Sequence, residues 1–206
     1  QVRKRKLILM SATLGAVLDW GVGCGRIARH FLERGQTNIH GADIDAMNIA
    51  WLNQTMGWNQ ATRVDFDPPM PYADASIDVA YSYSVFTHLA YDDQLKWLAE
   101  LRRVLKPGGY AFMTVCGESG VYVSKFRELK ANPGFVREYL DRGFYDFAAQ
   151  NVGVDAGREG YYRLIAHTRR FIRDVWSGYL DVHRILPCFM EQQDMIVLQR
   201  PVDAPA

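Results

Sequence analysis

The chain has 206 residues, of which 49% are hydrophobic and 23% charged, a composition typical of a folded globular protein rather than a disordered one. Lys and Arg number 24 against 23 Asp and Glu, and the net charge of +1 lacks the strongly basic character of duplex-binding proteins. No apolar run is long enough to cross a bilayer, and three cysteines without a CxxC pair indicate neither a disulfide framework nor a zinc site. The basic start of the chain is followed by only four apolar residues, too few for the core of a secretory signal. We therefore expect a cytoplasmic protein with no metal site and with neither a nucleic-acid nor a membrane partner.

Short apolar or β-branched runs alternate along the chain with segments of helical period, a pattern typical of a parallel α/β sheet. Five strands are predicted in this alternation. Two closing strands lack a helix between them, so we expect them to be antiparallel neighbours. The predicted strands cover residues 16–18, 39–43, 63–66, 77–83, 110–115, 180–186 and 195–199.

Helical periodicity predicts four helices, over residues 27–32, 46–56, 92–105 and 168–179. In the clearest of them, 92–105, Asp92 or Asp93 is expected to supply the N-cap. Residues 117–166 form a long irregular segment rich in glycine and aromatic residues. We interpret the chain, 1–206, as one domain in which this segment is inserted at the carboxyl edge of the sheet, where ligands bind in open α/β folds. The insertion is either a lid or acceptor pocket, or an appendage that only packs.

A glycine-rich loop, Asp19-Trp20-Gly21-Val22-Gly23-Cys24-Gly25, follows the first predicted strand. Glycines let the backbone turn tightly and let a ligand approach the main chain. In the dinucleotide fingerprint G-x-G-x-x-G the third small residue would fall at Arg26, which is bulky, and no Gly-Lys-Ser/Thr follows to make a P-loop. The spacing therefore argues against both of these phosphate-binding loops.

Two acidic residues flank this loop in the predicted sheet. Asp19 repels pyrophosphate and suits a cationic group such as an amine or a sulfonium. Asp43 ends the second strand, where an acid can accept hydrogen bonds from both ribose hydroxyls. The pattern predicts a phosphate-free, positively charged nucleoside, a description that S-adenosylmethionine meets. Capping of the loops by the two acids is the alternative.

These residues resemble the class I S-adenosylmethionine-dependent methyltransferases. The likeness covers about residues 16–115 and the C-terminal strands, and its last stretch resembles a subgroup of bacterial methyltransferase domains. It implies a Rossmann-like, seven-stranded, mostly parallel sheet with helices on both faces and an antiparallel last strand. The stretches that carry it are residues 17–26, 41–45, 69–81, 84–89, 97–109 and 193–198.

The resemblance implies S-adenosylmethionine as the cofactor and assigns its contacts. Asp19 would orient the loop and the methionine amino group, Asp43 would hold the ribose, and Ile44 would pack on the adenine. The other implied contacts are Gly21, Gly23 and Gly25 with the methionine and adenosine, Asp65 and Phe66 with the adenine edge and face, and Tyr83 and Ser84 with the methionine end.

Methyl transfer to a hydroxyl needs a group that removes the hydroxyl proton, and histidine is the common base near neutral pH. His88 follows the fourth strand, close to where the methyl group should point, and His167 begins the last helix after the aromatic insertion. Both are candidate catalytic residues, with packing roles as the alternative. Aromatic residues of the insertion, Tyr161 and Tyr162 among them, could line an acceptor pocket or pack a lid.

The sequence thus predicts an S-adenosylmethionine-dependent methyltransferase that acts on a small-molecule or glycan acceptor, at oxygen. A non-catalytic module that binds S-adenosylmethionine is one alternative. A nicotinamide-dependent oxidoreductase is another, against which the bulky Arg26 argues.

Overall fold

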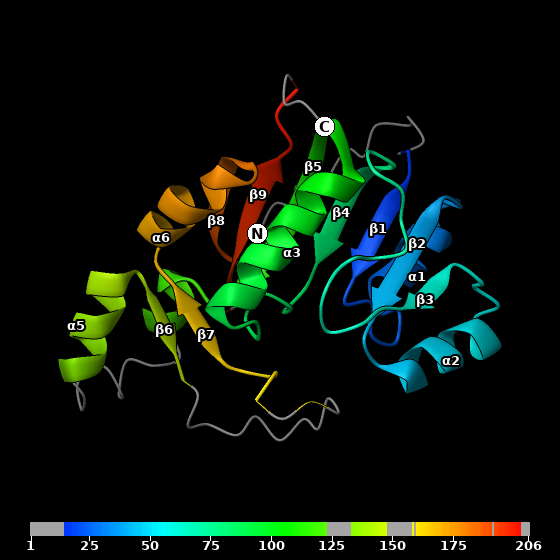
Figure 1. Cartoon of the computed structure of the whole chain (residues 1–206). Coiled ribbons are helices and arrows are strands. Elements are labelled where there is room, and N and C mark those ends of the chain that lie inside the picture. Colours follow the sequence, from blue (N-terminus) through cyan, green and yellow to red (C-terminus); the bar gives the residue numbers. More distant parts are fainter. Residues whose placement is uncertain (1–14, 123–132, 148–157, 159, 191, 203–206) are drawn as a thin grey trace, which may run out of the picture.

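The computed structural model describes residues 15–122, 133–147, 158, 160–190 and 192–202, and these fold around one seven-stranded sheet (Figure 1). The strand order is β3-β2-β1-β4-β5-β9-β8. Neighbouring strands from β3 to β5 are parallel, whereas β9 is antiparallel to both β5 and β8. The strands are β1 (Val17–Trp20), β2 (Ile39–Asp43), β3 (Ala61–Arg63), β4 (Ile77–Ser82), β5 (Leu105–Val115), β8 (Asp181–Met190) and β9 (Gln193–Gln199). The predicted fold class and the antiparallel closing pair are confirmed.

Helices pack on both faces of the sheet, because side chains alternate between its faces along each strand. In β1, Leu18 and Trp20 join the large core that also holds residues of α3 and α6, while Val17 joins a second core with residues of α1 and α2. The helices are α1 (Ala28–Leu32), α2 (Ala46–Thr55), α3 (Tyr91–Val104) and α6 (Arg169–Val175), the last continued by a 3-10 turn, η1 (Trp176–Gly178). No helix in the described part of the chain combines the length and the apolar character that a membrane span requires.

Helix α3 begins one residue earlier than predicted, and its N-cap differs. Ala90 is the N-cap residue, and no side chain caps the helix by a hydrogen bond. Asp92 and Asp93 lie in the first turn instead, where carboxylates interact favourably with the helix dipole. The predicted role of these two aspartates as N-caps is therefore wrong.

Strand β3 also differs from the prediction, which placed it at residues 63–66. The strand covers Ala61–Arg63, and only the Val64 amide continues toward β2, donating to the Asp43 carbonyl at 2.9 Å. Asp65 then turns the chain, because its side chain accepts a hydrogen bond from the next amide, that of Phe66, at 2.7 Å.

The segment between β5 and α6 is more regular than predicted. It contains α5 (Pro133–Arg142) and a two-stranded antiparallel sheet of β6 (Phe144–Asp146) and β7 (Ile165–His167). In Figure 1, α5, β6 and β7 lie at the left of the molecule, on the opposite side from α2. Residues 123–132, 148–157 and 159 of the predicted insertion lie outside the described residues.

Candidate active site

The glycine loop, residues 21–25, turns back across the carboxyl end of β2. Its three glycines all have positive φ, with values of 79°, 50° and 74°, and the Gly21 amide donates to Ala42 O at 2.7 Å. A Cβ on Gly21 would lie 2.3 Å from Cγ2 of Val85, whereas a Cβ on Gly23 would meet nothing within 4 Å. Gly21 therefore satisfies a packing constraint, and Gly23 faces open space that a ligand can fill.

Asp19 is a buried carboxylate at the end of β1, with 3% of its surface exposed. The Tyr81 hydroxyl donates to its Oδ2 at 2.7 Å. Burial, reinforced by the charge of Asp43, raises the pKa of Asp19 to about 7. No described Lys, Arg or His nitrogen lies within 4.0 Å of this carboxylate, so a cationic ligand group would supply the charge that it lacks.

Asp43 lies at the end of β2, and both of its carboxylate oxygens are oriented by the backbone. Gly23 N donates to Oδ2 at 2.7 Å and Asp45 N donates to Oδ1 at 2.9 Å. Burial raises the pKa of Asp43 above its ordinary value. Each oxygen retains acceptor capacity for a further hydrogen bond, so the carboxylate can receive two ligand hydroxyls.

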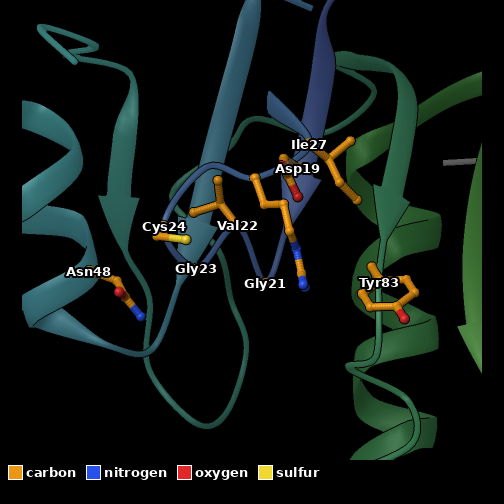
Figure 2. Close-up of a pocket in the computed structure, with 9 residues that line it drawn as sticks. Asp19, Gly21, Val22, Gly23, Cys24, Ile27, Asn48 and Tyr83 are labelled. Atoms are coloured by element: carbon orange, nitrogen blue, oxygen red, sulfur yellow. The ribbon is translucent and has the colours of Figure 1, made fainter. Parts of the chain in front are cut away.

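Two adjoining cavities open over the glycine loop. The smaller, of about 360 Å³, includes Asp19, and the larger, of about 660 Å³, includes Asp43. Figure 2 shows Asp19 beside the loop, with Tyr83 on one side of the opening and Asn48 of α2 on the other. The volumes lie in the range of small-molecule sites.

The structure brings most of the predicted site residues to these cavities. Gly25 does not line either one, because it is buried and a Cβ there would lie 2.7 Å from Leu52 Cδ2. The predicted residues that line the larger cavity are Gly21, Gly23, Asp43, Ile44, Tyr83, Ser84 and His88.

Asp65 and Phe66 do not line the cavity, because β3 ends earlier than predicted. Arg63 and Val64 take the places next to the ligand space. The Phe66 ring instead packs edge-to-face against Tyr161, with ring centroids 4.6 Å apart.

His88 lies in the segment of residues 84–90 between β4 and α3, which we call the His88 segment. Its Nδ1 lies 2.7 Å from the Arg163 carbonyl oxygen, and its ring stacks on Tyr162 with centroids 4.2 Å apart. Because a carbonyl only accepts, Nδ1 carries the proton and Nε2 is left as an acceptor. Burial lowers the pKa of His88, which keeps the ring neutral. A neutral histidine with a free Nε2 on a cavity wall can act as a general base.

His167 is not brought to the cavity. It is fully buried in the core, and its Nε2 lies 3.0 Å from Oε1 of Gln94. Burial lowers its pKa to about 3. The structure thus separates the two histidines that the sequence offered as candidate bases, and only His88 faces the ligand space.

The cavity also contains residues that the sequence did not single out as ligand contacts. Arg26 lines both cavities, with its guanidinium 5.3 Å from the centroid of the Tyr83 ring. Its position directly after the glycine loop was a signal that could have marked it. Trp97 of α3 also lines the larger cavity, and its helical context gave no local sign of this. Tyr161 and Tyr162, which the sequence offered as possible residues of an acceptor pocket, line the same cavity.

Comparison with known proteins relates these features to methyltransferases. A family model described as a methyltransferase domain matches residues 18–113. A dimethylglycine N-methyltransferase of Parasynechococcus marenigrum (strain WH8102) is 33% identical over 114 residues, covering 52% of this chain and 40% of that protein. An uncharacterized methyltransferase of Geobacillus sp. (strain WCH70) is 27% identical over 161 residues, covering 75% of this chain and 66% of that protein. The chain spans less than two thirds of the length of these two relatives.

Solved structures share the fold at low sequence identity. A methyltransferase of Methanosarcina mazei that depends on S-adenosylmethionine has a TM-score of 0.64 at 18% identity, covering 93% of this chain and 95% of that chain. The 1,6-didemethyltoxoflavin-N1-methyltransferase of Burkholderia thailandensis, with bound 1,6-didemethyltoxoflavin and S-adenosylhomocysteine, has a TM-score of 0.61 at 16% identity, covering 91% and 72% of the two chains. The segment that matches the methyltransferase-domain family, residues 18–113, runs from β1 to β5 and carries both the glycine loop and Asp43, and the described chain shares the fold of a solved S-adenosylmethionine-dependent methyltransferase.

Proposed function

We propose that this chain transfers a methyl group from S-adenosylmethionine to a hydroxyl of a small-molecule or glycan acceptor, with His88 as the general base. The observation that carries the proposal is the position of His88 on the wall of the cavity that also contains Asp43, with its proton on Nδ1 and with no hydrogen bond from a described residue to its Nε2. The same cavity contains Asp43, which suits the nucleoside, and His88, which can accept a proton.

The described residues fit the cofactor at three points. Asp43 offers both oxygens to the ribose hydroxyls, and Asp19 supplies negative charge for the amino group and the sulfonium. Arg26 has no described carboxylate within 4.0 Å and suits the carboxylate of the methionine part. The open space over Gly23 leaves room for the ligand to approach the backbone.

When bound, S-adenosylmethionine supplies an electrophilic methyl group on a positively charged sulfur. His88 Nε2 would accept the hydroxyl proton as the acceptor oxygen takes the methyl group, and would then release that proton to water. The products would be a methyl ether and S-adenosylhomocysteine. Tyr162 stacks on the imidazole of His88. The cavity walls would orient the acceptor, and orientation of the reactants is the larger source of rate in such a displacement.

A nitrogen acceptor is the second candidate. Two curated relatives are named for nitrogen methylation, the dimethylglycine N-methyltransferase and a Caenorhabditis elegans phosphoethanolamine N-methyltransferase that is 26% identical over 149 residues. The free base of a tertiary amine has no N–H to lose during methyl transfer, so that step needs no base. Dependence of turnover on His88 therefore distinguishes a hydroxyl acceptor from such an amine.

The proposal is tested by calorimetry and by transfer of labelled methyl groups. We expect the chain to bind S-adenosylmethionine and S-adenosylhomocysteine, and Asp43→Ala to weaken both by about 10²- to 10⁴-fold, since two charge-assisted hydrogen bonds are lost. Against a panel of sugars, phenols and amines, His88→Ala should lower turnover by about 10²- to 10⁴-fold without changing affinity for S-adenosylhomocysteine. No binding by the wild-type chain would remove the proposal. Binding without turnover on any acceptor would favour the non-catalytic module.

A further inference from the structure

The His88 segment is held by residues 163–167, which we call the return strand. Ile165 N donates to Thr87 O at 2.8 Å, and Arg163 N donates to His88 O at 3.0 Å. The carbonyl of the same Arg163 accepts from the His88 ring at 2.7 Å. One residue of the return strand therefore fixes both the backbone and the imidazole of His88.

Gln94, in the first turn of α3, connects the same two segments inside the core. Its side chain is fully buried, and its Nε2 donates to Leu89 O at 2.8 Å. Its Oε1 lies 3.0 Å from Nε2 of His167, the last residue of the return strand. Because the Leu89 carbonyl only accepts, the amide nitrogen faces Leu89 and the amide oxygen faces His167. His167 therefore carries its proton on Nε2.

The surroundings of His167 maintain this arrangement. The rings of Phe144, Phe171 and Trp176 lie around it, with centroids 5.7 to 5.9 Å from that of the imidazole. Its Nδ1 has no hydrogen-bond partner in the described part of the chain. An imidazole in an apolar cage stays neutral, and its single N–H, on Nε2, matches the amide oxygen that Gln94 presents to it. The Leu89 carbonyl and His167 thus hold the two ends of the Gln94 amide, and Leu89 is the residue next to His88.

We propose that Gln94 and His167 are a pair of positioning residues that keep His88 in the tautomer with its proton on Nδ1 and with Nε2 open to the acceptor. The importance of that tautomer rests on the proposed function. The tautomer itself is a property of the chain without any ligand. A pair that only stabilised the core would change the melting temperature and leave the tautomer of His88 unchanged.

The first test uses the wild-type full chain, labelled with ¹⁵N at histidine and free of ligand. Ring ¹⁵N chemical shifts near pH 7 should show opposite tautomers for the two residues, with Nδ1–H at His88 and Nε2–H at His167. A proton on Nδ1 of His167 would overturn the proposal, because the Gln94 amide would then present the wrong end to Leu89. This measurement needs no variant to fold.

The second test compares Gln94→Leu with Leu98→Ala, a control on the same helix whose side chain is equally buried. Gln94→Leu should replace the single His88 tautomer by two tautomers in exchange. The double variant Gln94→Leu/His167→Leu should give the same change and no more, because residues that act as a unit are not additive. Leu98→Ala should lower the melting temperature and leave the His88 signals unmoved.

Either of two results would refute the positioning role: wild-type His88 signals in folded Gln94→Leu, or an equal shift in Leu98→Ala. Failure of the proposed function shows itself elsewhere, as absent binding of S-adenosylhomocysteine or absent methyl transfer by the wild-type chain. The two failures are therefore distinguishable.

Discussion

Replacing Asp19 by asparagine removes a buried carboxylate whose charged form lowers the free energy of unfolding. Burial raises the pKa of Asp19 from 3.8 to about 7, whereas the unfolded chain keeps the ordinary value. Between these two pH values the native state binds more protons than the unfolded state, so the stability of the wild type falls as pH rises from about 4 to about 7. Above pH 7 the full penalty is present.

The size of the effect follows from that shift in pKa. A shift of about 3 units corresponds to about 4 kcal/mol at 1.36 kcal/mol per unit. The Tyr81 hydrogen bond, which lowers this pKa, is already included in the shift. We expect Asp19→Asn to stabilise the ligand-free chain by about 4 kcal/mol at pH 8 and to raise its melting temperature by about 8 to 16 °C. At pH 5 most of this gain should disappear.

Thermal melts followed by circular dichroism from pH 5 to pH 9 would check this expectation. Tyr81→Phe is the matched control, because it removes the hydroxyl that donates to the Asp19 carboxylate. It should destabilise the chain at pH 8 and have less effect at pH 5, the opposite sign to Asp19→Asn. Parallel melting curves for Asp19→Asn and the wild type at every pH, or a lower melting temperature for the variant at pH 8, would refute the reasoning.

Three further predictions concern the ligand space. Gly21→Ala should destabilise the chain more than Gly23→Ala in urea unfolding, because only the Cβ at position 21 meets Val85. Gly23→Ala should lower the unfolding free energy by about 1 kcal/mol and weaken S-adenosylhomocysteine binding measured by calorimetry. Arg26→Ala should weaken the same binding by about 10-fold or more through loss of a charge-assisted hydrogen bond, and unchanged affinity would contradict the assignment of Arg26 to the methionine carboxylate. Because burial lowers the pKa of His88, the acid limb of the pH–rate profile should lie below pH 6.5, and a midpoint above 6.5 would contradict the assignment of that limb to a buried His88 with a lowered pKa.

Several elements of the site could be predicted from local sequence. The glycine loop and the acids at the ends of two strands depend on residues that are close together in the chain, and backbone sterics and strand periodicity act over that distance. The end of β3 could not be predicted to the residue. The end depends on whether the Phe66 amide donates to the sheet or to the Asp65 side chain, and it donates to the side chain.

The sequence by itself determined an α/β sheet with a loop made to receive a cationic nucleoside. Only the tertiary structure decided which histidine faces that ligand. His88 meets the Arg163 carbonyl across 75 residues, and His167 meets Gln94 across 73, so one imidazole lines the cavity while the other lies among buried rings. The physical reason is that neutrality and an open nitrogen depend on burial and hydrogen-bond partners brought in from distant segments, and no local pattern specifies these.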